Sequence, residues 1–416
     1  MSKNTSILII IGTFLLIVGG LIFFYVSSNN SGNISPTTQA TSSPFGDNSG
    51  DRTIDTNTQT TDFINKNNNI KKDQLIQLYK NPTSGSVFVT NKNNKTVVKF
   101  VDRAVGNIYQ YVPGIENGEV TRITNTTIPK IQETVWSSTG ENLILRYLDN
   151  DTDDIVSFSS KIKLDASSTD RVGEITGSFL SLKNIKQLVI SPKGDKIFGL
   201  VDKSDKSGTF GFIANLDGSN KKTVLDSPIT YWNVAWPKES VITLTTKPNY
   251  MDSGLLFFFN PQTSVMERML GNVIGMSILT NKDANLVAYS YSNNSSLSLD
   301  VYDTINKINK NIKIQTLADK CVWGNNNSKI LYCAVPKTVS SGNYPDVWYQ
   351  GLTSFEDDFW KIDTESGKTE LVYQIDPSEN INVDAFGLTI SLDDQYLSFT
   401  NKNDLSLWLL KLADSF

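Results

Sequence analysis

The chain has 416 residues, a net charge of −5 and no histidine. The acidic balance excludes a nucleic-acid binder that works through a basic face. The missing imidazole excludes Ser-His-Asp and Cys-His catalysis as well as histidine-ligated metal sites. An enzyme of this composition would depend on carboxylates, Lys or Tyr. No cofactor and no nucleic-acid partner are expected.

The first predicted element is a strongly apolar N-terminal segment. Residues 7–26, ILIIIGTFLLIVGGLIFFYV, carry no charge, and about 20 such residues span roughly 30 Å of hydrocarbon as a helix. Lys3 precedes the run and no Lys or Arg follows before Arg52. The positive-inside rule then places the N-terminus in the cytoplasm and the rest of the chain outside. We expect residues 1–26 to anchor a single-pass protein in the cell membrane.

A cleaved signal peptide is the alternative interpretation of the same segment. The apolar core of a signal peptide is usually shorter, and residues 23–30, FFYVSSNN, contain no A-x-A-like cleavage site. The next stretch, residues 27–70, is rich in Ser, Thr, Asn, Gly and Asp and has few large apolar side chains. Such a composition cannot bury enough surface to offset its ordering entropy, so it predicts a disordered linker.

From about residue 71 the sequence consists of short apolar runs separated by turn residues, which is typical of an all-β protein. One hairpin pattern recurs: an apolar strand end, a polar turn of four to six residues and a second apolar strand. VISPKGDKIFG, which starts at Val189, is one copy, and VWSSTGENLIL, which starts at Val135, is another. Aligned on the serine of the first example, the copies fall at Asn91, Ser137, Ser191, Trp236, Thr280, Gly324 and Ser391.

The spacing of these copies predicts a β-propeller. The steps between them are 46, 54, 45, 44, 44 and 67 residues, and a period near 45 with four short strands is the spacing of propeller blades. The last unit ends after a third strand, whereas residues 73–80, DQLIQLYK, are a spare apolar segment before the first unit. We expect this segment to supply the missing strand and close the ring. The fold prediction is a seven-bladed β-propeller over residues 71–416.

The turns SPKG at residues 191–194 and SSTG at residues 137–140 resemble those of TolB-type and WD40-like (PD40-type) propeller repeats. The resemblance covers residues 71–416 and extends to membrane-anchored bacterial propeller proteins. It implies protein–protein interaction in the cell envelope, although a fold by itself does not determine function. Several copies depart from the family pattern because they lack the Pro-Asp-Gly core of the turn, and no WD dipeptide ends the third strand.

The longest departure from the repeat is residues 335–358, VPKTVSSGNYPDVWYQGLTSFEDD. A connection between second and third strands shares one face of a propeller with the connections between blades, and residues 227–233 and 245–254 should project on that face as well. Aromatic residues with polar ends, gathered in loops, are typical of recognition surfaces. The candidate binding residues are Tyr344, Asp346, Trp348, Tyr349, Tyr231, Trp232, Lys247 and Tyr250. The alternative is that these rings cover the top of the core.

These features predict a non-enzymatic function: an extracytoplasmic binding or scaffold propeller that engages a protein, peptide or glycan through its loop face. The alternative is a carboxylate-dependent glycoside hydrolase, for which Asp346, Glu356, Asp357 and Asp358 are available. That alternative requires two carboxylates that converge at the channel mouth, one of them with a raised pKa. A third interpretation is a structural or sensory domain of a larger complex.

Two smaller groups complete the predicted sites. The hairpin centred on residues 324–329, GNNNSK, places the only two cysteines, Cys321 and Cys333, opposite each other on antiparallel strands. Opposed Cα atoms lie about 4.5–5.5 Å apart, within reach of a disulfide, and the alternative is two small buried thiols. Weak calcium candidates are Asp149, Asp151 and Asp153. The sixth position of that loop lacks the glycine and the twelfth lacks the carboxylate of a calcium loop, so the prediction is a solvated loop without metal.

Overall fold

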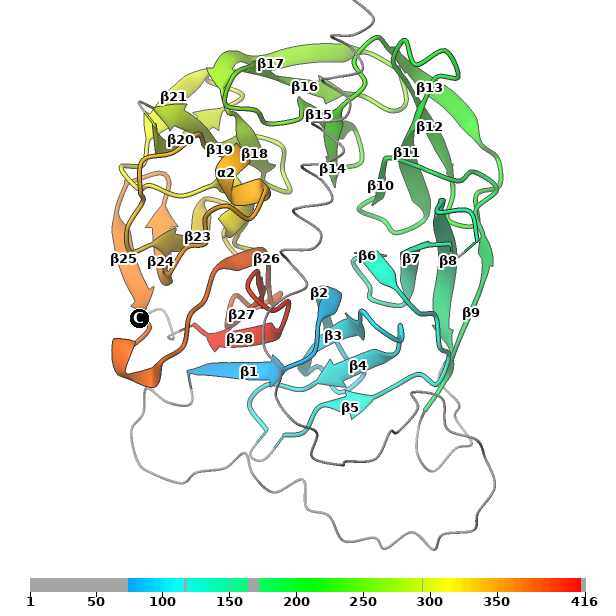
Figure 1. The fold of residues 1–416 in the computed structure, drawn as a ribbon, viewed down its shortest axis with the longest axis horizontal. Coiled ribbons are helices and arrows are strands. Elements are labelled where there is room, and N and C mark those ends of the chain that lie inside the picture. The colour runs from blue at the N-terminus through cyan, green and yellow to red at the C-terminus, as the bar shows by residue number, and fades with distance from the viewer. Residues whose placement is uncertain (1–73, 116–117, 150, 164–171, 294, 413–416) are drawn as a thin grey trace, which may run out of the picture. The chain divides into compact units, whose positions relative to one another are not determined.

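The computed structural model describes residues 74–412, apart from 116–117, 150, 164–171 and 294. The predicted anchor at residues 1–26 and the predicted linker at residues 27–70 therefore lie outside the described residues, as do residues 71–73. Within the described part of the chain, no helix combines the length and apolar character needed to cross a membrane. The described residues form seven four-stranded sheets arranged around a central axis (Figure 1). The predicted all-β, seven-bladed propeller is confirmed.

Each of the first six sheets is built from four consecutive antiparallel strands, of which the first lies nearest the axis (Figure 1). The first sheet contains β2 (Thr83–Thr90), β3 (Thr96–Asp102), β4 (Ile108–Tyr111) and β5 (Thr121–Arg122). The second contains β6 (Ile131–Trp136), β7 (Asn142–Leu148), β8 (Ile155–Lys163) and β9 (Glu174–Phe179). The third contains β10 (Gln187–Ile190), β11 (Lys196–Asp202), β12 (Thr209–Asn215) and β13 (Lys222–Ser227).

The next three sheets repeat this order. The fourth contains β14 (Trp232–Lys238), β15 (Val241–Thr246), β16 (Ser253–Phe259) and β17 (Met266–Ile274). The fifth contains β18 (Ser277–Thr280), β19 (Leu286–Asn293), β20 (Ser296–Asp303) and β21 (Ile308–Asn311). The sixth contains β22 (Cys321–Trp323), β23 (Ile330–Pro336), β24 (Asp357–Asp363) and β25 (Thr369–Tyr373). Short helices are η1 (Ala318–Lys320), α2 (Asp346–Tyr349) and η2 (Pro377–Glu379).

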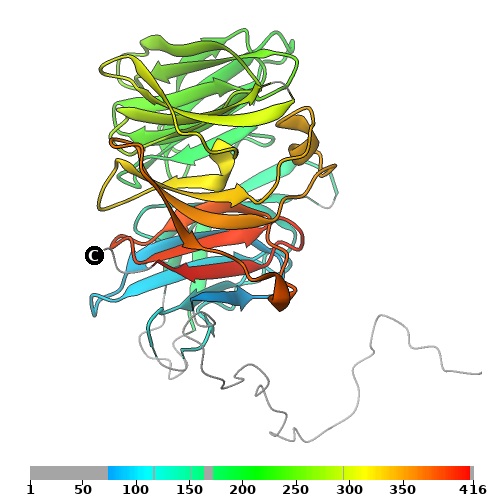
Figure 2. The ribbon, with the colours of Figure 1, turned by 90° about the vertical axis from the view of Figure 1, so that its left-hand side faces the viewer.

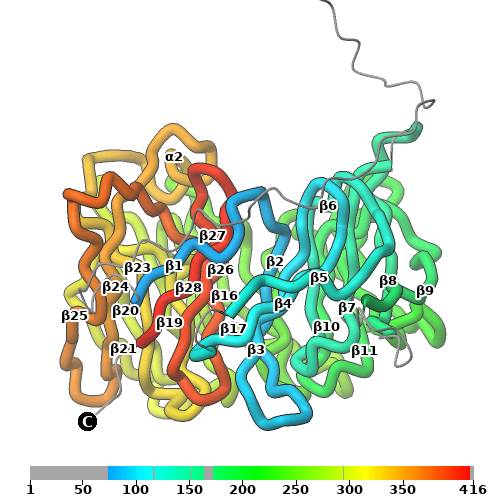
Figure 3. Tube along the Cα trace, turned by 90° about the horizontal axis from the view of Figure 1, so that it is seen from below, coloured from blue at the N-terminus to red at the C-terminus, as the bar shows by residue number. Residues whose placement is uncertain are grey.

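The seventh sheet joins the two ends of the described chain. It contains β26 (Ala385–Ile390), β27 (Tyr396–Asn401), β28 (Leu407–Lys411) and, as its outer strand, β1 (Leu75–Tyr79). Leu75 pairs with Leu410 and Ile76 with Leu409, and β1 and β28 lie side by side in Figure 3. The predicted closure of the ring by residues 73–80 is confirmed, because β1 supplies the partner that the last unit lacks.

The repeated turn has a specific hydrogen bond that explains its polar first residue. Ser191 Oγ accepts the backbone N–H of Lys196 at 3.1 Å, five residues later, and the same contact recurs from Ser137 to Asn142 and from Ser391 to Tyr396. In the fifth sheet the residue with this role is Asn281, one position after the Thr280 expected from the sequence alignment. Three residues after these acceptors the backbone is left-handed, at Gly140, Gly194, Ala284 and Asp394.

The core lies between neighbouring sheets, because each sheet packs one face against the sheet before it and the other against the sheet after it. The second strands are therefore apolar on both faces, and in β7 three successive residues, Leu143, Ile144 and Leu145, are fully buried. Burial of one such side chain stabilises a fold by roughly 1.5–3 kcal/mol. The stability of the ring thus depends on every interface between sheets.

The connections separate onto two faces of the propeller, between which the strands run (Figures 2 and 3). The face with the connections between second and third strands and between sheets is called the loop face here, and the opposite one the turn face. Residues 337–356, between β23 and β24, carry α2 on the loop face, whereas the turn between β10 and β11 is on the turn face. The long loop and the repeated turn therefore lie on opposite faces of the propeller.

Candidate functional site

Three loops of the loop face are joined by hydrogen bonds. Asp346 Oδ2 accepts the backbone N–H of Tyr250 at 2.7 Å, which links the long loop of the sixth sheet to the loop between β15 and β16. The N–H of Lys247 in that same loop donates to the carbonyl oxygen of Tyr231 at 3.1 Å. The three predicted loops therefore share a face, and these hydrogen bonds join them, one across the fifth sheet and one within the fourth, into one connected surface.

Three of the predicted binding residues are buried inside this surface. Tyr344 and Trp348 pack in an apolar cluster with Phe355, and the Tyr344 hydroxyl donates to the Ser340 carbonyl oxygen at 2.9 Å. Trp232 is buried as well, and its indole N–H donates to a serine hydroxyl at 3.2 Å. These rings match the alternative in which the aromatic residues cover the core. Their contribution is to hold the loops in place.

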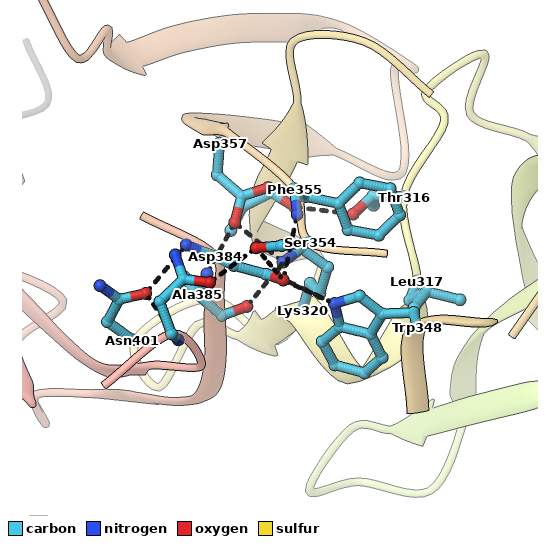
Figure 4. Close-up of polar contacts among 12 residues, drawn as sticks. Thr316, Leu317, Lys320, Trp348, Ser354, Phe355, Asp357, Asp384, Ala385 and Asn401 are labelled. Atoms are coloured by element: carbon cyan, nitrogen blue, oxygen red, sulfur yellow. Dashed lines mark hydrogen bonds and ion pairs between the residues drawn. The ribbon is translucent and has the colours of Figure 1, made fainter. Parts of the chain in front are cut away.

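A buried ion network lies beneath the long loop, and sequence reasoning did not identify it (Figure 4). Lys320 Nζ lies 2.8 Å from Asp357 Oδ2 and 2.5 Å from Asp384 Oδ1, and all three side chains are 0% exposed. The Trp348 indole N–H donates to both oxygens of Asp384, at 3.0 and 2.9 Å. Lys320 directly precedes β22 and Asp384 directly precedes β26, so the network ties the long loop to the innermost strands of two sheets.

The two carboxylates of this network satisfy part of the requirement for a hydrolase. Burial raises the pKa of Asp357 to about 6, although the neighbouring Lys320 charge acts to lower the pKa. Asp357 Oδ1 has no hydrogen-bond partner among the described residues. However, both carboxylates are fully buried, and Lys320 lies between them (Figure 4). In this structure neither carboxylate is open to a substrate.

A second carboxylate positions the exposed aromatic residue of the long loop. Asp319 Oδ2 accepts the hydroxyl of Tyr349 at 3.0 Å and also the hydroxyl of Ser277. Burial raises the pKa of Asp319, and burial together with the Asp319 charge raises the pKa of Tyr349 well above its ordinary value. The Tyr349 hydroxyl is thus fixed as a neutral donor while part of its ring remains exposed.

The exposed members of this surface form what we call the loop-face patch: Tyr231, Lys247, Met251, Tyr349 and Leu352. Tyr231 is 61% exposed, Met251 69% and Leu352 72%. The Tyr231 ring contacts two cations, since its centre lies 4.5 Å from Lys186 Nζ and 5.9 Å from Lys247 Nζ. Met251 and Leu352 were not among the predicted residues, because an isolated aliphatic side chain in a loop gives no signal in the sequence.

The three weak calcium candidates, Asp149, Asp151 and Asp153, lie in the connection between β7 and β8. Asp149 Oδ1 accepts the backbone N–H groups of Asp151 and Thr152 at 3.0 Å each, which forms a tight turn. Asp154 pairs with Lys183 at 3.0 Å. Within the residues that the structure describes, no group of three Asp, Glu, His or Cys residues is arranged to hold a metal ion.

The two cysteines occupy the predicted register, because Cys321 pairs with Cys333 across β22 and β23. Their Cα atoms lie 4.1 Å apart and their sulfur atoms 2.11 Å apart, as in a disulfide. Both side chains are buried in the core between the fifth and sixth sheets. The oxidation state of the isolated protein stays a prediction, with a test given below.

Comparisons with known proteins agree at the level of the fold. Neither a protein-family model nor a curated protein matches the chain. Among solved structures, the chain is similar to TolB from Acinetobacter baumannii, with 11% identity, a TM-score of 0.42 and coverage of 68% of this chain and 62% of that one. A puromycin hydrolase has 13% identity, a TM-score of 0.49 and coverage of 76% and 50%. An oligogalacturonate lyase from Vibrio parahaemolyticus has 9% identity, a TM-score of 0.47 and coverage of 81% and 100%.

These likenesses concern the propeller fold alone. The chain spans 62% of the length of the TolB chain and half of the puromycin hydrolase chain that it matches. The propeller fold agrees with the resemblance to TolB-type repeats in the sequence. A fold by itself does not determine function.

Proposed function

We propose that this protein is a membrane-anchored, extracytoplasmic binding propeller that engages a protein or peptide partner through the loop-face patch. The observation that supports this proposal is the patch itself: exposed Tyr231, Met251, Tyr349 and Leu352 on loops that buried residues hold in place. Aromatic residues and Met are enriched in the centres of protein interfaces. Loops that are already ordered lose little conformational entropy on binding.

The network beneath the long loop supports the same proposal. Trp348, Lys320 and Asp384 fix the loop from below, and Asp319 fixes the hydroxyl of Tyr349. Buried ion pairs and hydrogen bonds of this kind restrict the loop to one conformation, as a surface that binds a specific partner requires. The membrane anchor and the extracytoplasmic location are part of the proposal and depend on residues 7–26 and the charge asymmetry around them.

The experiment is site-specific photo-crosslinking in intact cells that express the full chain. A photoreactive residue at Leu352 is compared with one at Ile305, which is also 72% exposed but lies on the turn face between β20 and β21. We expect a discrete adduct from position 352 and none from position 305. Tyr231→Ala should reduce the adduct several-fold. Equal adducts from both positions, or an adduct that Tyr231→Ala leaves unchanged, would contradict the proposal.

The hydrolase alternative has less support from the site. Asp357 and Asp358 are buried, and Asp346 accepts a backbone N–H within the surface. A retaining or inverting glycosidase needs two carboxylates that flank an accessible bond. No such pair is exposed among the described residues of the long loop, so we propose binding rather than hydrolysis.

A further inference from the structure

A groove opens between the fifth and sixth sheets and shares no residue with the loop-face patch. Its volume is about 530 Å³, within the range of roughly 300–1,000 Å³ that is usual for small-molecule sites. The groove is lined by Leu297, Ser298, Asn311, Lys313, Ile314, Gln315, Val335, Pro336, Trp360 and Thr369. It lies where β21 ends, at Asn311, and is bordered by β24 and β25 of the neighbouring sheet through Trp360 and Thr369.

The lining combines an apolar wall with a single charge. Four aliphatic residues and the Trp360 indole supply apolar surface, and four neutral polar residues complete the wall together with Lys313. No carboxylate lines the groove, and in the described part of the chain Lys313 forms no ion pair. The lining therefore carries a net positive charge, which favours an anionic ligand.

Several polar groups of the groove have no protein partner. Within the described residues, Lys313 Nζ, the Trp360 indole N–H and the Thr369 hydroxyl make no hydrogen bond, and neither does the side-chain oxygen of Gln315. The Gln315 amide nitrogen is already held, since it donates to Ser296 at 3.1 Å. Three free donors and one free acceptor thus border one apolar wall. Lys313, Gln315 and Thr369 are exposed, so these groups are accessible to a ligand that carries a carboxylate and hydroxyl groups.

We propose that this groove binds an acidic saccharide unit, that is, a sugar ring that carries a carboxylate. Lys313 would pair with the carboxylate, because a charge-assisted hydrogen bond is about twice as strong as a neutral one. Gln315 and Thr369 would bond ring hydroxyl groups. Trp360 and the aliphatic residues would cover the C–H surface of the ring, which water solvates poorly.

The test measures binding of D-glucuronate to the full-length protein by saturation-transfer NMR and calorimetry. Two comparison compounds separate the two parts of the proposal: D-glucose has the hydroxyl groups without the charge, and benzoate has the charge without the hydroxyl groups. We expect glucuronate to bind with a Kd of about 1 mM or below, and both comparison compounds to bind at least several-fold more weakly. Absence of glucuronate binding at about 10 mM, or equal binding of either comparison compound, would overturn the proposal.

Matched variants place the binding in the groove. Lys313→Gln should weaken glucuronate binding about tenfold, as the loss of one charge-assisted hydrogen bond predicts. Lys307→Gln is the control, because Lys307 is exposed, has φ of 57° against 59° at Lys313, and lies on the turn face of the same sheet. Trp360→Phe should weaken binding as well. Equal affinities of the Lys313 and Lys307 variants would exclude the groove as the site.

The affinity for a second compound distinguishes a glycan chain from a free sugar acid as the ligand. A glucuronate-containing disaccharide that binds more tightly than the monosaccharide would identify a unit of a glycan chain as the ligand. Equal affinities would identify a free sugar acid. Both results support an acidic saccharide site in the groove. If the disaccharide still binds more tightly than the monosaccharide in the Lys313→Gln variant, the proposed site is refuted.

Discussion

Replacement of Lys320 by Met tests whether the buried network holds the propeller together. Met keeps most of the length of the Lys side chain, so the change removes the charge and leaves little cavity. It leaves Asp357 and Asp384 buried without their shared cation. Loss of one partner of a buried ion pair costs about 3–5 kcal/mol, and we expect Lys320→Met to lower the free energy of unfolding by that amount at pH 7.5.

The pH dependence makes the prediction specific. Burial raises the pKa of Asp357 from its ordinary value of 3.8 to about 6, so the folded state binds this proton more tightly than the unfolded state. The resulting stabilisation is fully present below about pH 4 and is lost as the pH rises through about 6. Lys320 lowers the pKa of Asp357, and without Lys320 the pKa rises further. The cost of Lys320→Met should therefore be smaller at pH 5 than at pH 7.5.

The assay is urea unfolding of the full chain followed by tryptophan fluorescence at both pH values. Lys329→Met is the matched control, because the Lys329–Glu365 ion pair is in the same sheet and is exposed; its loss should cost at most about 1 kcal/mol. Asp357→Asn added to Lys320→Met should recover part of the stability. A cost below about 1 kcal/mol at pH 7.5, or the same cost at both pH values, would refute the reasoning.

Three further predictions concern the ring and its turns. Cys321 and Cys333 should resist alkylation in the absence of a reductant, so that the intact mass stays unchanged. Cys321→Ala should lower the free energy of unfolding by about 2–4 kcal/mol. Alkylation of both cysteines in the unfolded chain without a reductant would contradict a disulfide. Ala284→Gly should raise stability by up to about 1 kcal/mol, because Ala284 has φ of 57°, and a lower melting temperature would show that the turn is not strained. Deletion of residues 75–79 should abolish the single cooperative melting transition, since it reopens the edge of β28; a retained transition would contradict ring closure by this strand.

The fold could be predicted because the repeat appears in the sequence in several independent ways. The apolar strand ends, the polar turns and the period near 45 residues all depend on local chemistry, such as the Ser191 hydroxyl that accepts a backbone N–H in the turn. The closure by residues 73–80 could also be inferred, because the last unit lacked a fourth strand and this apolar segment belonged to none of the repeat units. The alignment was wrong at Thr280 because the sequence allows either Thr280 or Asn281 to be matched to Ser191. Only Asn281 accepts the backbone N–H in the turn, from Leu286.

The site was less predictable because burial depends on contacts between distant segments. Trp348 and Tyr349 are adjacent in sequence and both aromatic, yet one is buried on Asp384 and the other is partly exposed against Asp319. Lys320 looks like a surface residue in the sequence, and its burial depends on Asp384, 64 residues later. Charged residues that directly precede the first strand of a repeat are the signal that could have identified this pair.

The closure by β1 also has a consequence for how the protein is made. Gln74 and Lys411, which hydrogen-bond at the junction of β1 and β28, are 337 residues apart in the chain. At about 5–20 residues per second, a ribosome needs roughly 15–70 s between them. During this interval the nascent chain carries its closing strand, including the apolar Leu75, without the partner that will cover it. The strand with which the ring closes is therefore unpaired until synthesis of the last sheet is complete.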